Sequence, residues 1–184
     1  MMSDSHDEAR LPRLIIVAGQ PGSGKSTLAR LLSRSIRCPV VSRDELKEGF
    51  INSGSAKAMP QDEISRLTFE SFFEVIEFML SRGITLIAEA AFQHKVWAPK
   101  LERLKSRAEV IIILCDVTPE LAFERRAARA VSDPAREQFH KRTPLADYQA
   151  PDFDLPTMAV DTSEGYVPCL DQIRMFALGL GDSL

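Results

Sequence analysis

The chain has 184 residues, a hydrophobic fraction of 45% and a formal net charge of −3 at pH 7. This length suits one domain with one core, and the net negative charge disfavours broad electrostatic binding to nucleic acid. No apolar run approaches the roughly 20 residues that a membrane helix needs, so a membrane protein is not expected either.

The N-terminal segment and the cysteines indicate the setting of the protein. Residues 1–12 lack the basic start and apolar stretch of a signal peptide, and we expect a disordered leader there. Cys38, Cys115 and Cys169 form no C-x-x-C pair, which supports neither a zinc site nor a disulfide framework. Cys115 ends an apolar run and is expected to be a core thiol. This cysteine usage favours a reducing, cytoplasmic setting.

Short apolar runs alternate with amphipathic segments along the rest of the chain. The runs are rich in β-branched residues, which is typical of buried parallel strands. They span 14–18, 40–41, 84–88, 110–114 and 158–160. The amphipathic segments predict helices over 27–36, 63–82, 96–107, 119–130 and 166–178. The alternation predicts an α/β three-layer sandwich around a five-stranded parallel sheet, as a single domain over 13–184 whose ligands bind beyond the C-terminal strand ends.

A glycine-rich loop joins the first strand to the first helix and matches the whole pattern G-x-x-x-x-G-K-[ST], the P-loop or Walker A motif. Its residues are Gly19, Gln20, Pro21, Gly22, Ser23, Gly24, Lys25, Ser26 and Thr27. Such a loop directs backbone N–H groups at phosphate oxygens, and the helix N-terminus adds partial positive charge. We expect Lys25 to reach the β- and γ-phosphates, Ser26 to ligate Mg²⁺ and Thr27 to contact the α-phosphate.

A carboxylate, Asp44, follows the second run in the segment Ser42-Arg43-Asp44. At the C-terminal edge of the sheet it can accept the proton of an attacking hydroxyl during phosphoryl transfer. The alternative is that Asp44 caps the next helix. Arg43 and Lys47 are candidates for holding a negatively charged substrate, with solvated surface charges as the alternative.

A lone acid, Glu89, ends the third run among small apolar residues. Buried charges are rarely kept without a partner. Three roles are open: contact with Mg²⁺ through water, a hydrogen bond to a substrate hydroxyl, or a salt bridge at a strand end. We expect the acceptor pocket under the helix at 63–82 and the loop at 50–60.

Basic residues are concentrated between positions 125 and 142. They are Arg125, Arg126, Arg129, Arg136, His140, Lys141 and Arg142. A basic segment opposite a P-loop can close on the nucleotide and neutralise charge that develops on the phosphoryl group. We therefore predict a lid around 125–142, with Arg125 and Arg129, which share a helix face, in the catalytic step. The alternative is an ordinary solvated helix.

The P-loop, the Ser42-Arg43-Asp44 segment, Glu89 and the arginine-rich helix together resemble small P-loop kinases. This group includes polynucleotide 5′-kinases, chloramphenicol phosphotransferase, gluconate kinase, zeta-toxin-like kinases and many AAA-type ATP-binding kinases. The resemblance implies the P-loop nucleoside triphosphate hydrolase/kinase fold with strand order 2-3-1-4-5, and ATP and Mg²⁺ as cofactors. It also implies Asp44 as the base, Arg125 in contact with the nucleotide at the start of the lid, and Thr162 in a turn that borders the adenine.

The expected function is transfer of the γ-phosphate of ATP to a hydroxyl of a small molecule, such as a sugar acid, nucleoside, antibiotic or nucleotide sugar. A polynucleotide 5′-hydroxyl kinase is one alternative, but the group's usual aspartate and arginine are replaced here by Glu89 and Lys47. A nucleotide hydrolase or a non-catalytic ATP-binding sensor is another. The chain has no N-K-x-D segment, and no D-x-x-G follows the third strand, which disfavours a GTPase. No pattern indicates an oligomeric state.

Overall fold

The computed structural model describes residues 11–54, 59–92, 94–133 and 148–180. Most of the leader predicted over 1–12, and the lid positions after 133, therefore lie outside the described residues. The strands are β1 (Arg13–Gly19), β2 (Val40–Ser42), β3 (Leu86–Glu89), β4 (Glu109–Asp116) and β5 (Thr157–Asp161). The helices are α1 (Lys25–Ile36), α2 (Arg43–Asn52), α3 (Gln61–Ser81), α4 (His94–Leu104), α5 (Pro119–Ser132) and α7 (Leu170–Leu178).

The five strands form one sheet in the order β2-β3-β1-β4-β5, and all neighbouring pairs are parallel. The predicted fold class and strand order are thus confirmed. Ser42 at the end of β2 lies in register with Glu89 at the end of β3, and Glu89 with Val17 of β1. The polar residues that follow the apolar runs therefore lie together at the C-terminal edge of the sheet.

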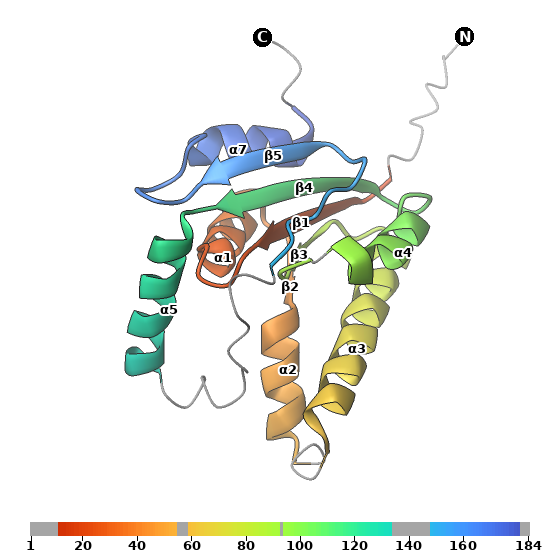
Figure 1. The fold of residues 1–184 in the computed structure, drawn as a ribbon. Coiled ribbons are helices and arrows are strands. Elements are labelled where there is room, and N and C mark those ends of the chain that lie inside the picture. Colours follow the sequence, from red (N-terminus) through yellow and green to blue (C-terminus); the bar gives the residue numbers. More distant parts are fainter. Residues whose placement is uncertain (1–10, 55–58, 93, 134–147, 181–184) are drawn as a thin grey trace, which may run out of the picture.

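Helices cover both faces of the sheet, as Figure 1 shows. On one face, α3 and α4 contribute Phe72, Phe73 and Trp97 to a core with alternate residues of β1. On the other face, residues of α1 and α7 pack on the intervening β1 residues. Trp97 is 5% exposed, and its ring lies 4.4 Å from that of Phe92 between centroids, so the indole packs in this core. Cys115 is buried, as predicted.

Several element boundaries differ from the predictions for local reasons. The helix predicted from 166 begins at Leu170, because Val167 exchanges backbone hydrogen bonds with Asp161 of β5 and cannot be helical. Helix α5, predicted over 119–130, continues two residues further, to Ser132. Helix α2 also includes positions 50–52 of the predicted loop.

Helix α3 ends at Ser81, within one residue of the predicted end at 82. Gly83, with φ of 73°, follows the last helical turn and donates its N–H to Leu80 O, while Ile84 donates to Met79 O. This pair of bonds is the Schellman motif, which uses a left-handed residue to satisfy the last carbonyls of a helix. None of the helices in the described residues combines the length and apolarity that crossing a membrane requires.

Candidate active site

The P-loop lies between the end of β1 and the start of α1, and the start of α5 packs against it. Gly24 is the N-cap of α1, with φ of 80°, and no side chain caps that helix. Within the described residues, no acceptor is present for the backbone N–H groups of Gly22, Gly24, Lys25 and Ser26. Unpaired N–H groups at a helix N-terminus form an anion site. The loop geometry therefore fits a phosphate chain.

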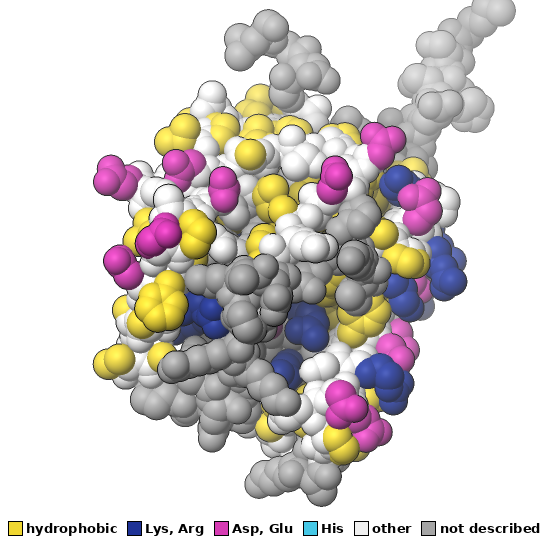
Figure 2. Space-filling view, viewed as in Figure 1, with side chains coloured by type: hydrophobic (Ala, Val, Ile, Leu, Met, Phe, Trp, Pro, Cys, Tyr) yellow, Lys and Arg dark blue, Asp and Glu magenta, His cyan; other side chains and the backbone are white. Residues whose placement is uncertain are grey.

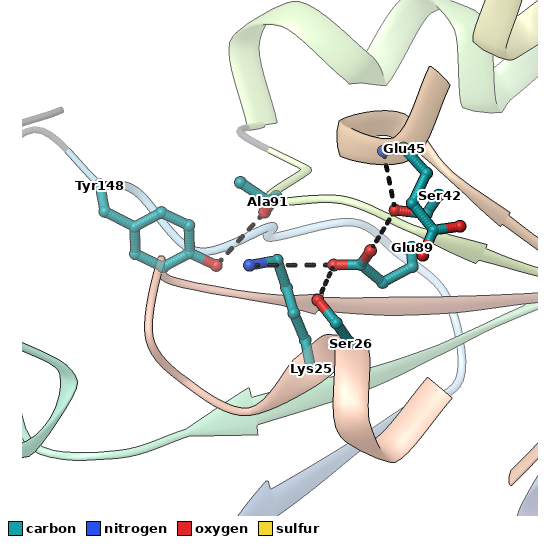
Figure 3. Close-up of polar contacts among 7 residues, drawn as sticks. All are labelled: Lys25, Ser26, Ser42, Glu45, Glu89, Ala91 and Tyr148. Atoms are coloured by element: carbon teal, nitrogen blue, oxygen red, sulfur yellow. Dashed lines mark hydrogen bonds and ion pairs between the residues drawn. The ribbon is translucent and has the colours of Figure 1, made fainter. Parts of the chain in front are cut away.

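The P-loop side chains meet Glu89 at the end of β3 (Figure 3). Glu89 is 2% exposed, and its Oε1 accepts a hydrogen bond of 3.1 Å from Ser26 Oγ and lies 3.9 Å from Lys25 Nζ. Its Oε2 accepts a hydrogen bond of 2.7 Å from Ser42 Oγ. The buried carboxylate is therefore satisfied by one ammonium and two hydroxyls. Of the three predicted roles, a salt bridge at the strand end is thus present.

The oxygen atoms of this cluster are also the donors that Mg²⁺ prefers. The Ser26 hydroxyl donates a hydrogen bond to Glu89, so the lone pairs of the Ser26 oxygen remain available to a cation. The described residues contain no group of three or more His, Cys, Asp or Glu that could hold a metal by themselves. Mg²⁺ commonly takes one or two protein ligands and completes its shell with phosphates and water. Ser26 and Glu89 therefore fit Mg²⁺ that arrives with a nucleotide.

Helix α2 begins at this cluster and carries the predicted base. Its N-cap is Ser42, whose Oγ accepts from Glu45 N, so the alternative that Asp44 caps the helix is wrong. Asp44 lies half-buried in the first turn and has no hydrogen-bond partner among the residues that the structure describes. Among the described residues, no hydrogen bond therefore competes with a substrate hydroxyl for the Asp44 carboxylate.

The two predicted substrate cations also lie on α2. Burial lowers the pKa of the Arg43 guanidinium below its usual value, and the neighbouring Asp44 carboxylate partly offsets this shift. Lys47 is 7% exposed, so it is not a solvated surface charge. Positions 43, 44 and 47 share one side of the helix at about 100° per residue. Both cations therefore lie on the same side of α2 as Asp44.

A groove of about 550 Å³ lies between β2, α2 and α3, near the predicted acceptor pocket. Its α2 lining consists of positions 42, 45, 46, 49 and 50, which lie on the other side of the helix from Asp44 and Lys47. Residues 55–58 of the predicted loop lie outside the described residues. An acceptor that meets Asp44 would thus approach the opposite side of α2 from this groove.

Thr162, predicted to lie in a turn that borders the adenine, contacts the P-loop backbone. It is 5% exposed, and its Oγ1 lies 2.7 Å from Ser23 O and 3.2 Å from Asp116 O. Arg125 donates to Thr162 O at 2.8 Å and to Ser163 O at 2.9 Å. Thr162 therefore links the loop after β5 to the P-loop and to α5.

The arginines of α5 are only partly placed as predicted. Arg125 is hydrogen-bonded to the turn after β5 and lies close to the P-loop. A methyl group placed on Gly24 would be 3.8 Å from Arg125 Nη1. Arg129 follows one turn later on the same helix and is half-buried. The remaining basic positions of the predicted lid, 136 and 140–142, lie outside the described residues.

Sequence reasoning missed three contributors. The sequence predicts Gln20 only as part of the phosphate site, but its Nε2 donates to Val117 O at 2.7 Å and links the loop to the residue that follows β4. Ser42 has no predicted role, although its position after an apolar run is typical of a residue at the edge of the sheet. Tyr148 donates to Ala91 O at 3.4 Å, and its ring extends toward the end of the Lys25 side chain (Figure 3). Burial raises the pKa of Tyr148.

The surface charge on this side of the molecule is uneven. Figure 2 shows Lys and Arg side chains between α5 and α3, and others along the right-hand margin, with Asp and Glu side chains spread over the same face. The chain as a whole carries a net charge of −3. Cationic side chains are thus present on this face although the chain as a whole is negatively charged.

The sheet order and the P-loop before α1 define a P-loop protein of the kinase type. The family model AAA_33, an AAA domain, matches residues 14–149, so the chain belongs to that family. A search of curated proteins found no match.

Solved structures share this fold at low sequence identity. A candidate kinase from Chloroflexus aurantiacus is 24% identical, with a TM-score of 0.75 over 92% of this chain and 96% of that one. The APS kinase of Mycobacterium tuberculosis, solved with AMPPNP and APS, is 16% identical, with a TM-score of 0.64 over 95% and 99%. A gluconokinase from Sinorhizobium meliloti is 19% identical, with a TM-score of 0.57 over 92% and 91%.

Proposed function

We propose that this chain is an ATP- and Mg²⁺-dependent phosphotransferase that moves the γ-phosphate onto a hydroxyl of a small molecule. The observation that carries the proposal is the contact of Glu89 with Ser26 and Lys25 directly beside open P-loop N–H groups. A P-loop that only packed the fold would not need a buried carboxylate against its ammonium. The kinase-type fold of the family supports the same conclusion.

The P-loop backbone and Lys25 would bind the triphosphate. Lys25 is 9% exposed, so its charge acts in a poorly hydrated setting where attraction to phosphate oxygens is stronger than in water. Lys25 Nζ lies 3.9 Å from Glu89 Oε1 in the structure, and phosphate oxygens would replace Glu89 as its partner. Glu89 and Ser26 would then be free to hold the cation, directly or through water. Bound Mg²⁺ would supply neutralisation of the negative charge on the phosphate chain.

Asp44 would accept the proton of the acceptor hydroxyl. Its position in the first turn of α2 places it one helical turn or less from Ser42, which contacts Glu89. Arg43 and Lys47 on the same side of α2 would attract an acceptor that carries a carboxylate or phosphate group. Arg125 and Arg129 of α5 would neutralise charge on the transferred group from the other side of the P-loop.

Label transfer from γ-labelled ATP to a panel of acceptors tests the proposal. The panel contains sugar acids, neutral sugars, nucleosides, aminoglycoside and phenolic antibiotics, and an oligonucleotide with a 5′-hydroxyl. We expect a labelled small-molecule product that depends on Mg²⁺. Labelled inorganic phosphate alone would indicate a hydrolase, and a labelled oligonucleotide would indicate the polynucleotide alternative.

The substitution Asp44→Asn separates catalysis from binding. The amide keeps the shape of the side chain but cannot take a proton, and general-base catalysis typically contributes 10²–10⁴-fold. We expect phosphate transfer to fall about 10²-fold or more, with ATP affinity within about twofold of wild type. Transfer at the wild-type rate would remove Asp44 from the mechanism.

A further inference from the structure

Ser42 makes its strongest contact with Glu89 rather than with the helix that it caps. Its hydroxyl donates to Glu89 Oε2 at 2.7 Å, whereas the backbone N–H of Glu45 lies 3.5 Å from Ser42 Oγ. The first distance is typical of a hydrogen bond to a charged oxygen, and the second is at the limit of a hydrogen bond. Ser42 is 7% exposed, so water does not readily replace its hydroxyl.

This contact determines which way the Glu89 carboxylate faces. Ser42 occupies Oε2, and this leaves Oε1 for Ser26 and Lys25 of the P-loop. The terminal torsion of a glutamate is broad, so the carboxylate plane is set by its hydrogen bonds. Without the Ser42 hydroxyl, Oε2 would be buried without its donor, and the carboxylate would turn to compete for Ser26. A buried acceptor left unpaired is destabilising, which drives that rotation.

We propose that Ser42 is a positioning residue that orients Glu89 and thereby sets the affinity of the nucleotide complex for Mg²⁺. This inference rests on the proposed function, in which Ser26 and Glu89 hold the cation. Residues that orient a metal ligand typically change metal affinity 10- to 100-fold when they are removed. Loss of the Ser42 hydroxyl should therefore weaken Mg²⁺ binding by about tenfold and leave metal-free nucleotide binding near wild type.

The competing explanation is that Ser42 matters only as a helix cap. Thr118 provides a matched control, because its Oγ1 caps α5 by accepting from Leu121 N at 3.3 Å. Thr118 is exposed, and no contact joins it to Glu89 among the described residues. Ser42→Ala and Thr118→Ala therefore both remove a cap, but only the first removes a donor from the carboxylate.

The experiment titrates Mg²⁺ into the full chain saturated with a fluorescent ATP analogue, without any acceptor. We expect Ser42→Ala to need about tenfold more Mg²⁺ at the midpoint. Ser42→Thr, which keeps the hydroxyl, should stay within about threefold of wild type, and Thr118→Ala should match wild type. If Ser42→Ala fails to fold, Ser42→Gly removes the hydroxyl with little loss of capping, because glycine is tolerated at an N-cap.

A second substitution tests whether Ser42 acts through Glu89. In a Glu89→Gln background, adding Ser42→Ala should shift the Mg²⁺ midpoint by less than about threefold, since interacting residues are not additive. Equal Mg²⁺ midpoints for Ser42→Ala and Thr118→Ala, or a full additive loss in the double variant, would overturn the inference. A wild-type chain that binds no nucleotide, or binds it without any response to Mg²⁺, would instead refute the proposed function.

Discussion

Replacement of Gly22 by alanine would force the P-loop away from α5. A methyl group at Gly22 would lie 2.3 Å from Ala122 O, whereas Cβ atoms essentially never approach another atom within 3.0 Å. The loop and the helix would therefore have to separate by about 0.7 Å. The φ of Gly22 is +93°, and a left-handed backbone costs an L-residue a further 1–2 kcal/mol or so.

This displacement falls on the groups that would bind phosphate. A misplacement of about 1 Å in a binding site can reduce a rate about 10²-fold, so a shift approaching that size should weaken ATP binding about 10- to 100-fold. Titration with a fluorescent ATP analogue measures the affinity, and urea unfolding measures the stability. We expect Gly22→Ala to lower both the affinity and the free energy of unfolding.

Two other glycines separate the clash from the backbone strain. Gly83 has φ of +73° and Gly49 lies within α2, and a methyl group at either would meet nothing within 4 Å. Gly83→Ala should lose about 1–2 kcal/mol of stability from strain alone, and Gly49→Ala should gain about 0.5–1 kcal/mol. Neither should change ATP affinity. The reasoning is refuted if Gly22→Ala binds ATP as tightly as the Gly83→Ala variant.

Three further predictions concern the core and the thiols. Trp97→Ala should cost about 3–5 kcal/mol in urea unfolding, because the indole is buried against Phe92, and a loss under about 2 kcal/mol would contradict that packing. A thiol reagent at pH 8 should modify the exposed Cys169 first, since burial raises the pKa of Cys38 to about 11 and of Cys115 to about 12; equal rates would refute this order. The pKa values of both buried thiols in the folded state exceed the ordinary value of 9.0, so the folded protein holds these protons more tightly than the unfolded chain does. The free energy of unfolding, measured in urea, should therefore keep this contribution below pH 9 and decline as the pH rises toward 11–12. The decline should be less steep in Cys38→Ser, which has one buried thiol fewer.

The strands and the P-loop could be predicted because their signals are local. The run of β-branched residues stops at Gly19, and this predicts that the strand ends there. The glycines of the loop that follows allow its backbone to curl. Gly83 is similar, since a helix that reaches a residue with positive φ ends by its own backbone bonds. Such features depend on neighbours in sequence, which a single chain displays directly.

The roles of Ser42 and Thr162 could not be predicted in the same way. Ser42 contacts Glu89, which is 47 residues away, and Thr162 contacts Ser23, which is 139 residues away. Serine and threonine suit many caps and turns, so their types say little about which distant atom they will meet. The alternative in which Asp44 caps α2 is wrong, because Ser42, two positions earlier, is the N-cap.

The sequence by itself determined the alternation of strands and helices, the P-loop and the order of polar residues that follow each strand. Only the tertiary structure decided that β2 and β3 end in register, which brings Ser42 and Glu89 together. It also decided that Lys47 is buried and that Arg125 is anchored to the turn after β5. The physical reason is that backbone periodicity is encoded within a few residues, whereas side-chain contacts across the sheet edge depend on strand order and register.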